Sequence, residues 1–133
     1  MQRTTTVTHR TSLFEDAAAI VEAEYATDLS LDDIARRVAS SRRQLQRAYA
    51  EIGQTTFREH LTGVRMERAA EMLGVRGLTV REVAHRVGYR QPAQFAKAFR
   101  RHHGDAPSGF RASRRFEALG AGRGDSAFTQ VAA

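Results

Sequence analysis

The segment SRRQLQRAYAE, from Ser41 to Glu51, combines arginine and glutamine side chains at helical spacing. At 100° per residue, the apolar residues Leu45, Ala48 and Tyr49 fall on one helix face together with Ile52, which follows the segment. The opposite face carries Arg43, Gln46, Arg47 and Ala50. Arginine can donate two parallel hydrogen bonds to guanine O6 and N7, and glutamine can pair similarly with adenine. This pattern predicts a helix that reads base edges in a DNA major groove.

The start of the same helix offers groups suited to the DNA backbone. Ser41, followed three residues later by Gln44, is typical of a helix N-cap. Arg42 stands in the first turn, where its guanidinium and the free amides of the helix end can together bind a phosphate. We therefore expect Ser41 and Arg42 to orient the helix on DNA rather than to read its sequence.

An internal repeat shows that the chain contains this unit twice. LDDIARRV at 31–38 matches VREVAHRV at 80–87, pairing Ala35 with Ala84. With one residue inserted, LQRAYAE at 45–51 then matches FAKAFRR at 95–101. Each copy predicts a short helix, a tight turn and a second helix with a polar outward face, which is the helix-turn-helix unit.

The second copy presents a different outward face. Its inward set is predicted to be Phe95, Ala98, Phe99 and His102, and its outward set Ala93, Ala96, Lys97 and Arg100, flanked by Arg90, Gln94 and Arg101. Ala93 could contact a thymine methyl group, and Lys97 could reach a guanine or a phosphate. Sequence reading is therefore expected to depend mainly on the first copy.

A helix predicted over 57–73, capped by Thr56 and Glu59, connects the two copies. Its apolar residues change face along its length: Phe57, Leu61 and Val64 lie together in the first half, and Met66, Ala69, Ala70 and Leu73 in the second. Such a helix requires a packing partner at each end, and it spans roughly 25 Å. The predicted fold is all-α, with about seven helices and two helix-turn-helix subdomains joined by a long linker helix.

Domain boundaries follow from these elements. A Ser12-x-x-Glu15 pattern predicts that the first helix starts at Ser12, which leaves 1–11 as a flexible segment. The DNA-binding domain is expected at 12–115, with subdomains at about 12–54 and 78–112 and the linker helix at about 56–73. The tail at 116–133, rich in glycine and alanine from Ala118, is predicted to be disordered.

Charge is unevenly distributed along the 133 residues. The formal net charge is +6, yet 13–35 contains seven of the 15 acidic residues and none of the 21 basic ones. The remainder would attract a polyanion, as expected of a nucleic-acid-binding protein. A basic surface that serves only solubility is the alternative interpretation.

Several functional classes lack the residues that they need. There is no cysteine, so disulfides, thiol nucleophiles and cysteine-bound zinc are excluded. The five histidines show no HExxH spacing, and no run of roughly 18 apolar residues occurs. We expect a cytoplasmic protein that is not an enzyme, has no metal or cofactor and does not cross a membrane.

Three segments resemble the DNA-binding domain of the AraC/XylS family of bacterial transcription regulators: IARRVASSRRQLQRAY, RMERAAEML and VREVAHRVGYRQPAQFAKAFRRHHGDAPSGFR. The resemblance covers about 13–111, and its most specific part is Gly88-Tyr89 with Phe95, Phe99, Gly104, Pro107, Phe110 and Arg111. It implies seven homeodomain-like helices and two recognition helices in successive major-groove segments on one face of DNA. It also implies that Arg65 is an internal ion-pair partner and that RNA polymerase is an expected partner.

The resemblance includes departures and open alternatives. Gln91 stands where the family often has Ser or Asp as N-cap and is a poor cap, although Pro92 at the first helical position is favourable. The chain is expected to be of the small single-domain type, or else the DNA-binding fragment of a longer effector-controlled regulator. A protein-interaction module acting on RNA polymerase without reading DNA is the alternative from another class.

The candidate DNA-contacting residues are Ser41, Arg42, Arg43, Gln46, Arg47, Arg90, Gln91, Ala93, Gln94, Lys97, Arg100 and Arg101. Because both reading helices belong to one chain and differ in sequence, we expect a monomer to bind an asymmetric double-stranded DNA site of about two turns.

Overall fold

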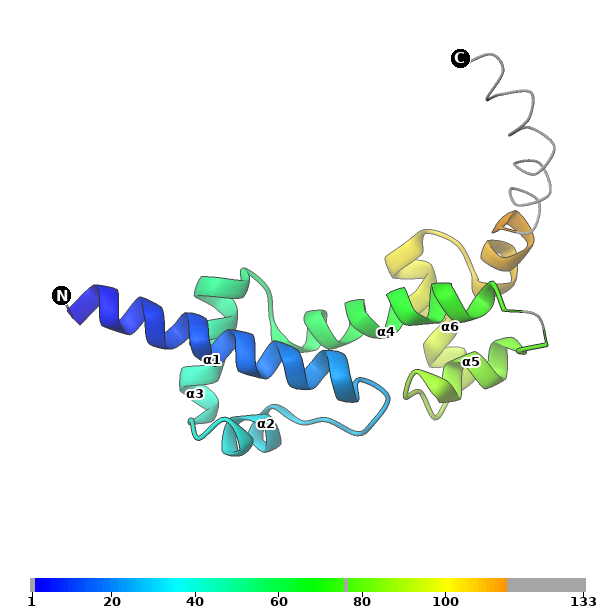
Figure 1. Cartoon of the computed structure of the whole chain (residues 1–133). Coiled ribbons are helices and arrows are strands. Elements are labelled where there is room, and N and C mark those ends of the chain that lie inside the picture. Colours follow the sequence, from blue (N-terminus) through cyan, green and yellow to red (C-terminus); the bar gives the residue numbers. More distant parts are fainter. Residues whose placement is uncertain (1, 76, 115–133) are drawn as a thin grey trace, which may run out of the picture.

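The computed structural model describes residues 2–75 and 77–114, which form helices and connecting turns without any strand (Figure 1). The elements are α1 (Gln2–Glu24), α2 (Leu31–Arg37), α3 (Arg42–Ala48), the π-helical turn η1 (Tyr49–Gly53), α4 (Phe57–Leu73), α5 (Val80–Arg86), α6 (Pro92–His103) and a last helical segment at 107–114. With η1 taken as the continuation of α3, these residues contain the predicted seven helices. The predicted disorder of 116–133 concerns residues outside the described ones.

The predicted start of the first helix at Ser12 is wrong. Helix α1 begins at Gln2, so the segment expected to be flexible at 1–11 is helical from that residue onward. Arg10 donates a hydrogen bond to the Glu51 carboxylate beyond α3, and the Thr11 hydroxyl donates to the Val7 carbonyl at 2.8 Å. These contacts support the early turns of α1 in spite of their polar sequence.

Helix α4 connects two lobes, each with its own core (Figure 1). In the first lobe, Leu61 of α4 joins buried residues of α1, α2 and α3. In the second, Met66, Ala69 and Leu73 pack against α5 and α6, with Phe95 and Phe99 fully buried. The two apolar faces predicted for this helix are therefore confirmed, and its bounds match the prediction.

The turns of the two helix-turn-helix units have the same geometry. The amide of Ser40 donates to the Ala35 carbonyl at 2.8 Å, and the amide of Tyr89 donates to the Ala84 carbonyl at 2.9 Å. Each is the long hydrogen bond of a Schellman helix end, which requires a left-handed residue just before the donor. That residue is Ala39 in the first unit, with φ of 55°, and Gly88 in the second, with φ of 98°.

Arg65, in the middle of α4, joins the two lobes. Its Nε donates to the Tyr25 carbonyl at 2.8 Å and one terminal nitrogen donates to the Thr27 carbonyl at 2.9 Å, while the guanidinium lies 5.6 Å from the centre of the Tyr89 ring. Burial lowers the pKa of Arg65. The residue is internal, as the family resemblance implied, but its hydrogen-bond partners are backbone carbonyls rather than the expected carboxylate.

The two turns predict opposite effects of exchanging alanine and glycine. Ala39→Gly removes an unfavourable left-handed alanine and should raise the free energy of unfolding by about 0.5–1 kcal/mol. Gly88→Ala should lower it by about 2 kcal/mol, since the new Cβ is strained and lies 3.0 Å from an Arg65 nitrogen and 3.1 Å from the Ala26 carbonyl oxygen. Urea unfolding of both variants measures these changes. Equal changes of the same sign in the free energy of unfolding of the two variants would contradict the assigned turn geometry.

Candidate nucleic-acid interface

Helix α3 separates its apolar and polar residues as predicted. The Ser41 hydroxyl accepts a hydrogen bond from the Gln44 amide at 3.1 Å and so fixes the first turn. Leu45, Ala48 and Tyr49 are buried, with the backbone continuing through η1. Within residues 42–50, the exposed ones are Arg42, Arg43, Gln44, Gln46, Arg47 and Ala50. The arginine and glutamine groups that could read base edges are therefore exposed to solvent.

Helix α6 begins after Gln91, whose side chain makes no capping hydrogen bond, with Pro92 at the first position. Its exposed residues include Ala93, Gln94, Lys97, Arg100 and Arg101, while Arg90 and Gln91 are exposed just before it. Ala96 is half-buried. The structure thus places the predicted residues of the second unit on the surface, with Arg90 just before α6 and the other cations, Lys97, Arg100 and Arg101, in its second half.

The predicted inward position of His102 is wrong. His102 is exposed, with its Nε2 3.9 Å from a Glu67 carboxylate oxygen. Its neighbour His103 turns inward instead, 3.0 Å from the Met66 carbonyl oxygen and with its ring centre 4.4 Å from that of Phe99. Helix α4 therefore packs on the side of α6 that carries Phe95, Phe99 and His103, four residues apart.

The partners of the basic side chains distinguish the candidate interface from the rest of the surface. Many arginines bind carboxylates or carbonyls, such as Arg37 with Glu24 and Arg111 with Leu73. Among residues 6–75 and 77–114, the cations without an ion pair, hydrogen bond or aromatic contact are Arg43, Arg47, Arg58, Arg81, Arg86, Arg90, Lys97, Arg100 and Arg101. Six of these belong to the predicted DNA-contacting set. Their charges remain available to an anionic partner.

Arg42 differs from its neighbours because it has an internal partner. One terminal nitrogen lies 3.3 Å from an Asp32 carboxylate oxygen on α2, and both side chains are more than half exposed. An ion pair of this kind contributes at most about 1 kcal/mol. Asp32 can therefore hold Arg42 beside the cleft without preventing its transfer to a phosphate.

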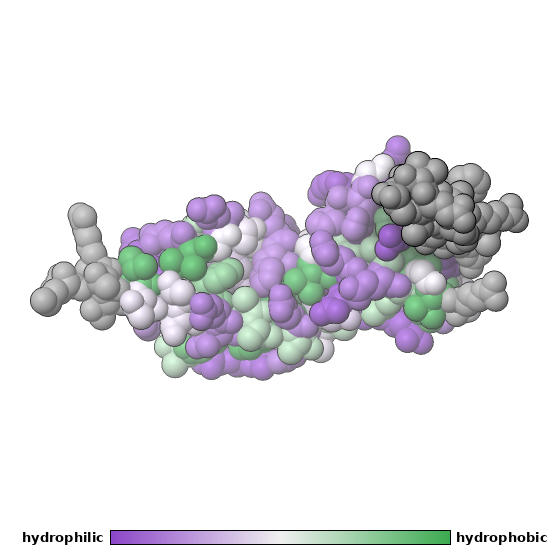
Figure 2. Space-filling view, turned by 45° about the horizontal axis from the view of Figure 1, so that its top comes forward, coloured by the Kyte–Doolittle hydropathy of each residue, from purple (hydrophilic) through white to green (hydrophobic). Residues whose placement is uncertain are grey.

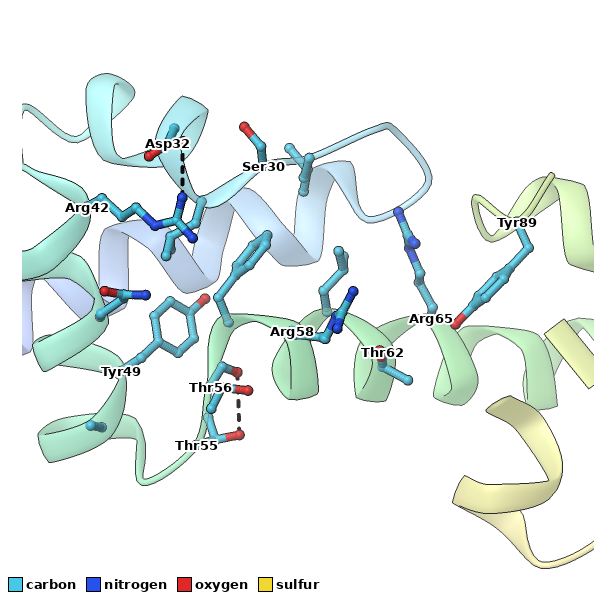
Figure 3. Close-up of a pocket in the computed structure, with 16 residues that line it drawn as sticks. Ser30, Asp32, Arg42, Tyr49, Thr55, Thr56, Arg58, Thr62, Arg65 and Tyr89 are labelled. Carbon is cyan, nitrogen blue, oxygen red and sulfur yellow. Dashed lines mark hydrogen bonds and ion pairs between the residues drawn. The ribbon is translucent and has the colours of Figure 1, made fainter. Parts of the chain in front are cut away.

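A cleft of about 740 Å³ lies beside α3, and α2, α3 and α4 form much of its wall (Figure 3). Gln46 and Arg42 line it from α3, and Arg58, Thr62 and Arg65 line it from α4. The sequence prediction did not include Arg58 and Thr62 because it treated α4 only as a spacer. Their signal in the sequence is weak, since they are polar residues in the first half of α4 on the helix face that Met66, Ala69 and Leu73 use for core packing in the second half.

A partly buried polar pair, Tyr49 and His60, supports α3 from behind. The Tyr49 hydroxyl lies 2.9 Å from His60 Nδ1, and the Tyr49 ring packs edge-on against Phe14 at 5.2 Å between ring centres. Burial raises the pKa of Tyr49 to about 12 and lowers the pKa of His60. At neutral pH the tyrosine is therefore protonated and the histidine neutral, and the hydrogen bond between them links α4 to the end of α3.

Other kinds of site find little support in the described part of the chain. It contains no group of three or more histidine, aspartate or glutamate residues placed to hold a metal ion. None of its helices is long and apolar enough to cross a bilayer. Hydrophilic residues cover most of the face in Figure 2, where hydrophobic residues form small separate patches.

Comparisons with known proteins agree with this geometry. A family model described as a helix-turn-helix domain matches residues 24–113. A transcriptional regulator from Chromobacterium violaceum, described as an AraC-type DNA-binding domain-containing protein, superposes with a TM-score of 0.73 at 28% identity, covering 77% of this chain and 92% of that one. This chain belongs to the AraC-type helix-turn-helix family.

Two further similar proteins bear on function. The DNA-binding domain of AdpA, solved in complex with a target DNA, superposes with a TM-score of 0.72 at 28% identity over 79% of this chain and 94% of that one. The Msm operon regulatory protein of Streptococcus mutans is 30% identical over 92 residues, which are 69% of this chain and 33% of that protein. This chain thus spans about a third of the length of that curated relative.

The His60 geometry predicts a pH dependence of stability. Because burial lowers the folded-state pKa of His60, the unfolded state binds its proton more readily. The stabilisation is complete above the unfolded value of about 6.5 and is lost as the pH falls toward the folded value. His60→Gln, which retains an acceptor for Tyr49, should show a smaller loss of unfolding free energy between pH 7 and pH 5. If the unfolding free energies of the native protein and His60→Gln fell in parallel between pH 7 and pH 5, the pH dependence would not come from His60.

Proposed function

We propose that this chain is the DNA-binding domain of a transcription regulator and inserts α3 and α6 into successive major-groove segments of promoter DNA. The observation that carries the proposal is the repeated placement of unpaired cations on the exposed face of the second helix in each unit. A similar domain that binds DNA, that of AdpA, supports it. The proposed domain covers about 12–115, with subdomains at 12–54 and 78–112.

The first unit would perform most of the base reading. Arg43, Gln46 and Arg47 extend from the exposed face of α3 and match the hydrogen-bonding edges of guanine and adenine. Arg42 would exchange Asp32 for a phosphate, and Ser41 would keep the first turn of α3 in the correct geometry. Substitutions at positions 43, 46 and 47 would therefore reduce the specificity for a base sequence. Substitutions at position 42 would reduce only the affinity for DNA.

The second unit would mainly provide affinity and orientation. Ala93 is small enough to approach a thymine methyl group, and Gln94 and Lys97 can hydrogen-bond a base or a phosphate. The remaining contacts, from Arg90, Gln91, Arg100 and Arg101, would be to the backbone. Since lysine and arginine contacts to phosphate carry no sequence information, this unit would discriminate less strongly between sites.

RNA polymerase is proposed as a protein partner, and the cytoplasm as the location, because both accompany transcription regulation in bacteria.

The basic helix faces could alternatively bind an acidic protein surface without reading DNA. A gel shift with random competitor DNA at two salt concentrations separates these functions. A sequence-selective complex supports the regulator, and its absence supports the interaction module.

Removal of a base-reading arginine should relax specificity. Arg47→Ala and Arg43→Ala are each expected to weaken binding to a selected site by about 1–3 kcal/mol and to reduce the preference at one or two base positions. Arg42→Ala should instead weaken all sequences alike. Quantitative binding to a library of single-base variants measures both effects. An unchanged ranking of sites for Arg47→Ala would show that this face does not read bases.

One chain should occupy one asymmetric site of about two turns, since α3 and α6 present different side chains. Sedimentation of the complex with a 25-base-pair duplex should give one chain per duplex. With six or more phosphate contacts, the slope of log affinity against log salt should be about −5 or steeper. Two chains bound cooperatively to a palindrome would contradict the monomeric arrangement.

A further inference from the structure

Arg58 is a basic residue of α4 that the base-reading helices leave unexplained. It is exposed and has no ion pair, hydrogen bond or aromatic contact with the residues that the structure describes. The neighbouring carboxylate of Glu59 accepts a hydrogen bond from the Thr55 hydroxyl at 3.1 Å. Arg58 is therefore a charged group on the linker helix that no internal partner neutralises.

The position of Arg58 relates it to both recognition helices. Together with Gln46 of α3 and Ala50 of η1 it lines the cleft described above. It also lines a second cleft, on the α6 side, with Ala98 and Arg101. Thr62, one helical turn later, is the other α4 residue shared by the two clefts. Figure 3 shows Arg58 and Thr62 on the part of α4 between α3 and α6.

DNA geometry determines what this part of α4 would face. Two successive major-groove segments on one side of a duplex are separated by a minor groove, which is bordered by the phosphates of both strands. In the proposed complex, the part of α4 that borders the clefts beside α3 and α6 would lie over this intervening backbone. A guanidinium group suits that position, because it can bind two phosphate oxygens at once.

We propose that Arg58, assisted by the Thr62 hydroxyl, binds a backbone phosphate in the DNA segment between the two recognition helices. The inference rests on the proposed function and adds a third contact region to it. Because a phosphate contact is the same for every base pair, this region would increase affinity for all sequences equally. It would also fix the linker helix on the duplex and thereby the rotation of both reading helices.

The first test compares Arg58→Gln with a control on the same helix, Arg68→Gln, whose native side chain is ion-paired with Glu71 and lines neither cleft. Arg58→Gln should weaken binding to selected and scrambled duplexes by a similar factor, about 3- to 30-fold. It should also reduce the size of the salt slope by about one. Arg68→Gln should stay within twofold of the native protein, and thermal unfolding confirms that both variants are folded.

The second test locates the phosphate. Single methylphosphonates, which remove one backbone charge, are placed at each position between the two major-groove segments. The native protein should lose affinity at one or two of these positions, and Arg58→Gln should lose little further affinity there. Equal losses for both proteins at every position, or an unchanged salt slope, would overturn the role of Arg58.

Loss of the Arg58 contact is distinguishable from failure of the proposed function. If the native chain forms no sequence-selective complex, the proposed function and the Arg58 contact fall together. If it binds selectively while Arg58→Gln behaves like Arg68→Gln, the proposed function stands and the Arg58 contact alone is wrong.

Discussion

The architecture depends on the packing of one helix, α4, into two separate cores. Its first half packs against α1 and places Leu61 in the core of the first lobe, and its second half places Met66, Ala69 and Leu73 against α5 and α6. Arg65 strengthens the junction by binding the carbonyls that follow α1 while its guanidinium lies near Tyr89 of the second unit. The spacing and relative rotation of α3 and α6 are consequently set by a rigid element rather than by a flexible linker.

Duplication provides two similar scaffolds with different surface chemistry. Both units share the buried alanine of the first helix and the same hydrogen-bonded turn. The start of α2 carries Asp32, which pairs with Arg42, whereas α5 carries the unpaired Arg81. The second unit therefore has more uncompensated positive charge beside its reading helix. This difference agrees with a division between sequence reading in one unit and backbone attachment in the other.

The sequence predicted those features that depend on local periodicity. The bounds of α4, its two faces and the buried positions Leu45, Tyr49, Phe95 and Phe99 all follow from helical spacing. Contacts between distant segments were not predictable in this way. Examples are the early start of α1 beside Glu51, the carbonyl partners of Arg65, and the inward turn of His103 against α4. The exposure of the candidate DNA-contacting residues also follows from helical spacing. Only the structure, however, places Arg58 between the two recognition helices.

The central claim is that α4 holds two reading helices at a fixed separation on DNA. Binding to a selected site and to derivatives with one to five base pairs inserted between its two contacted segments tests this directly. Each inserted pair moves the segments by about 3.4 Å and rotates one relative to the other. A rigid α4 predicts at least a tenfold loss of affinity from the first inserted pair. Equal affinity across the series would show that the two units bind independently and would contradict the account.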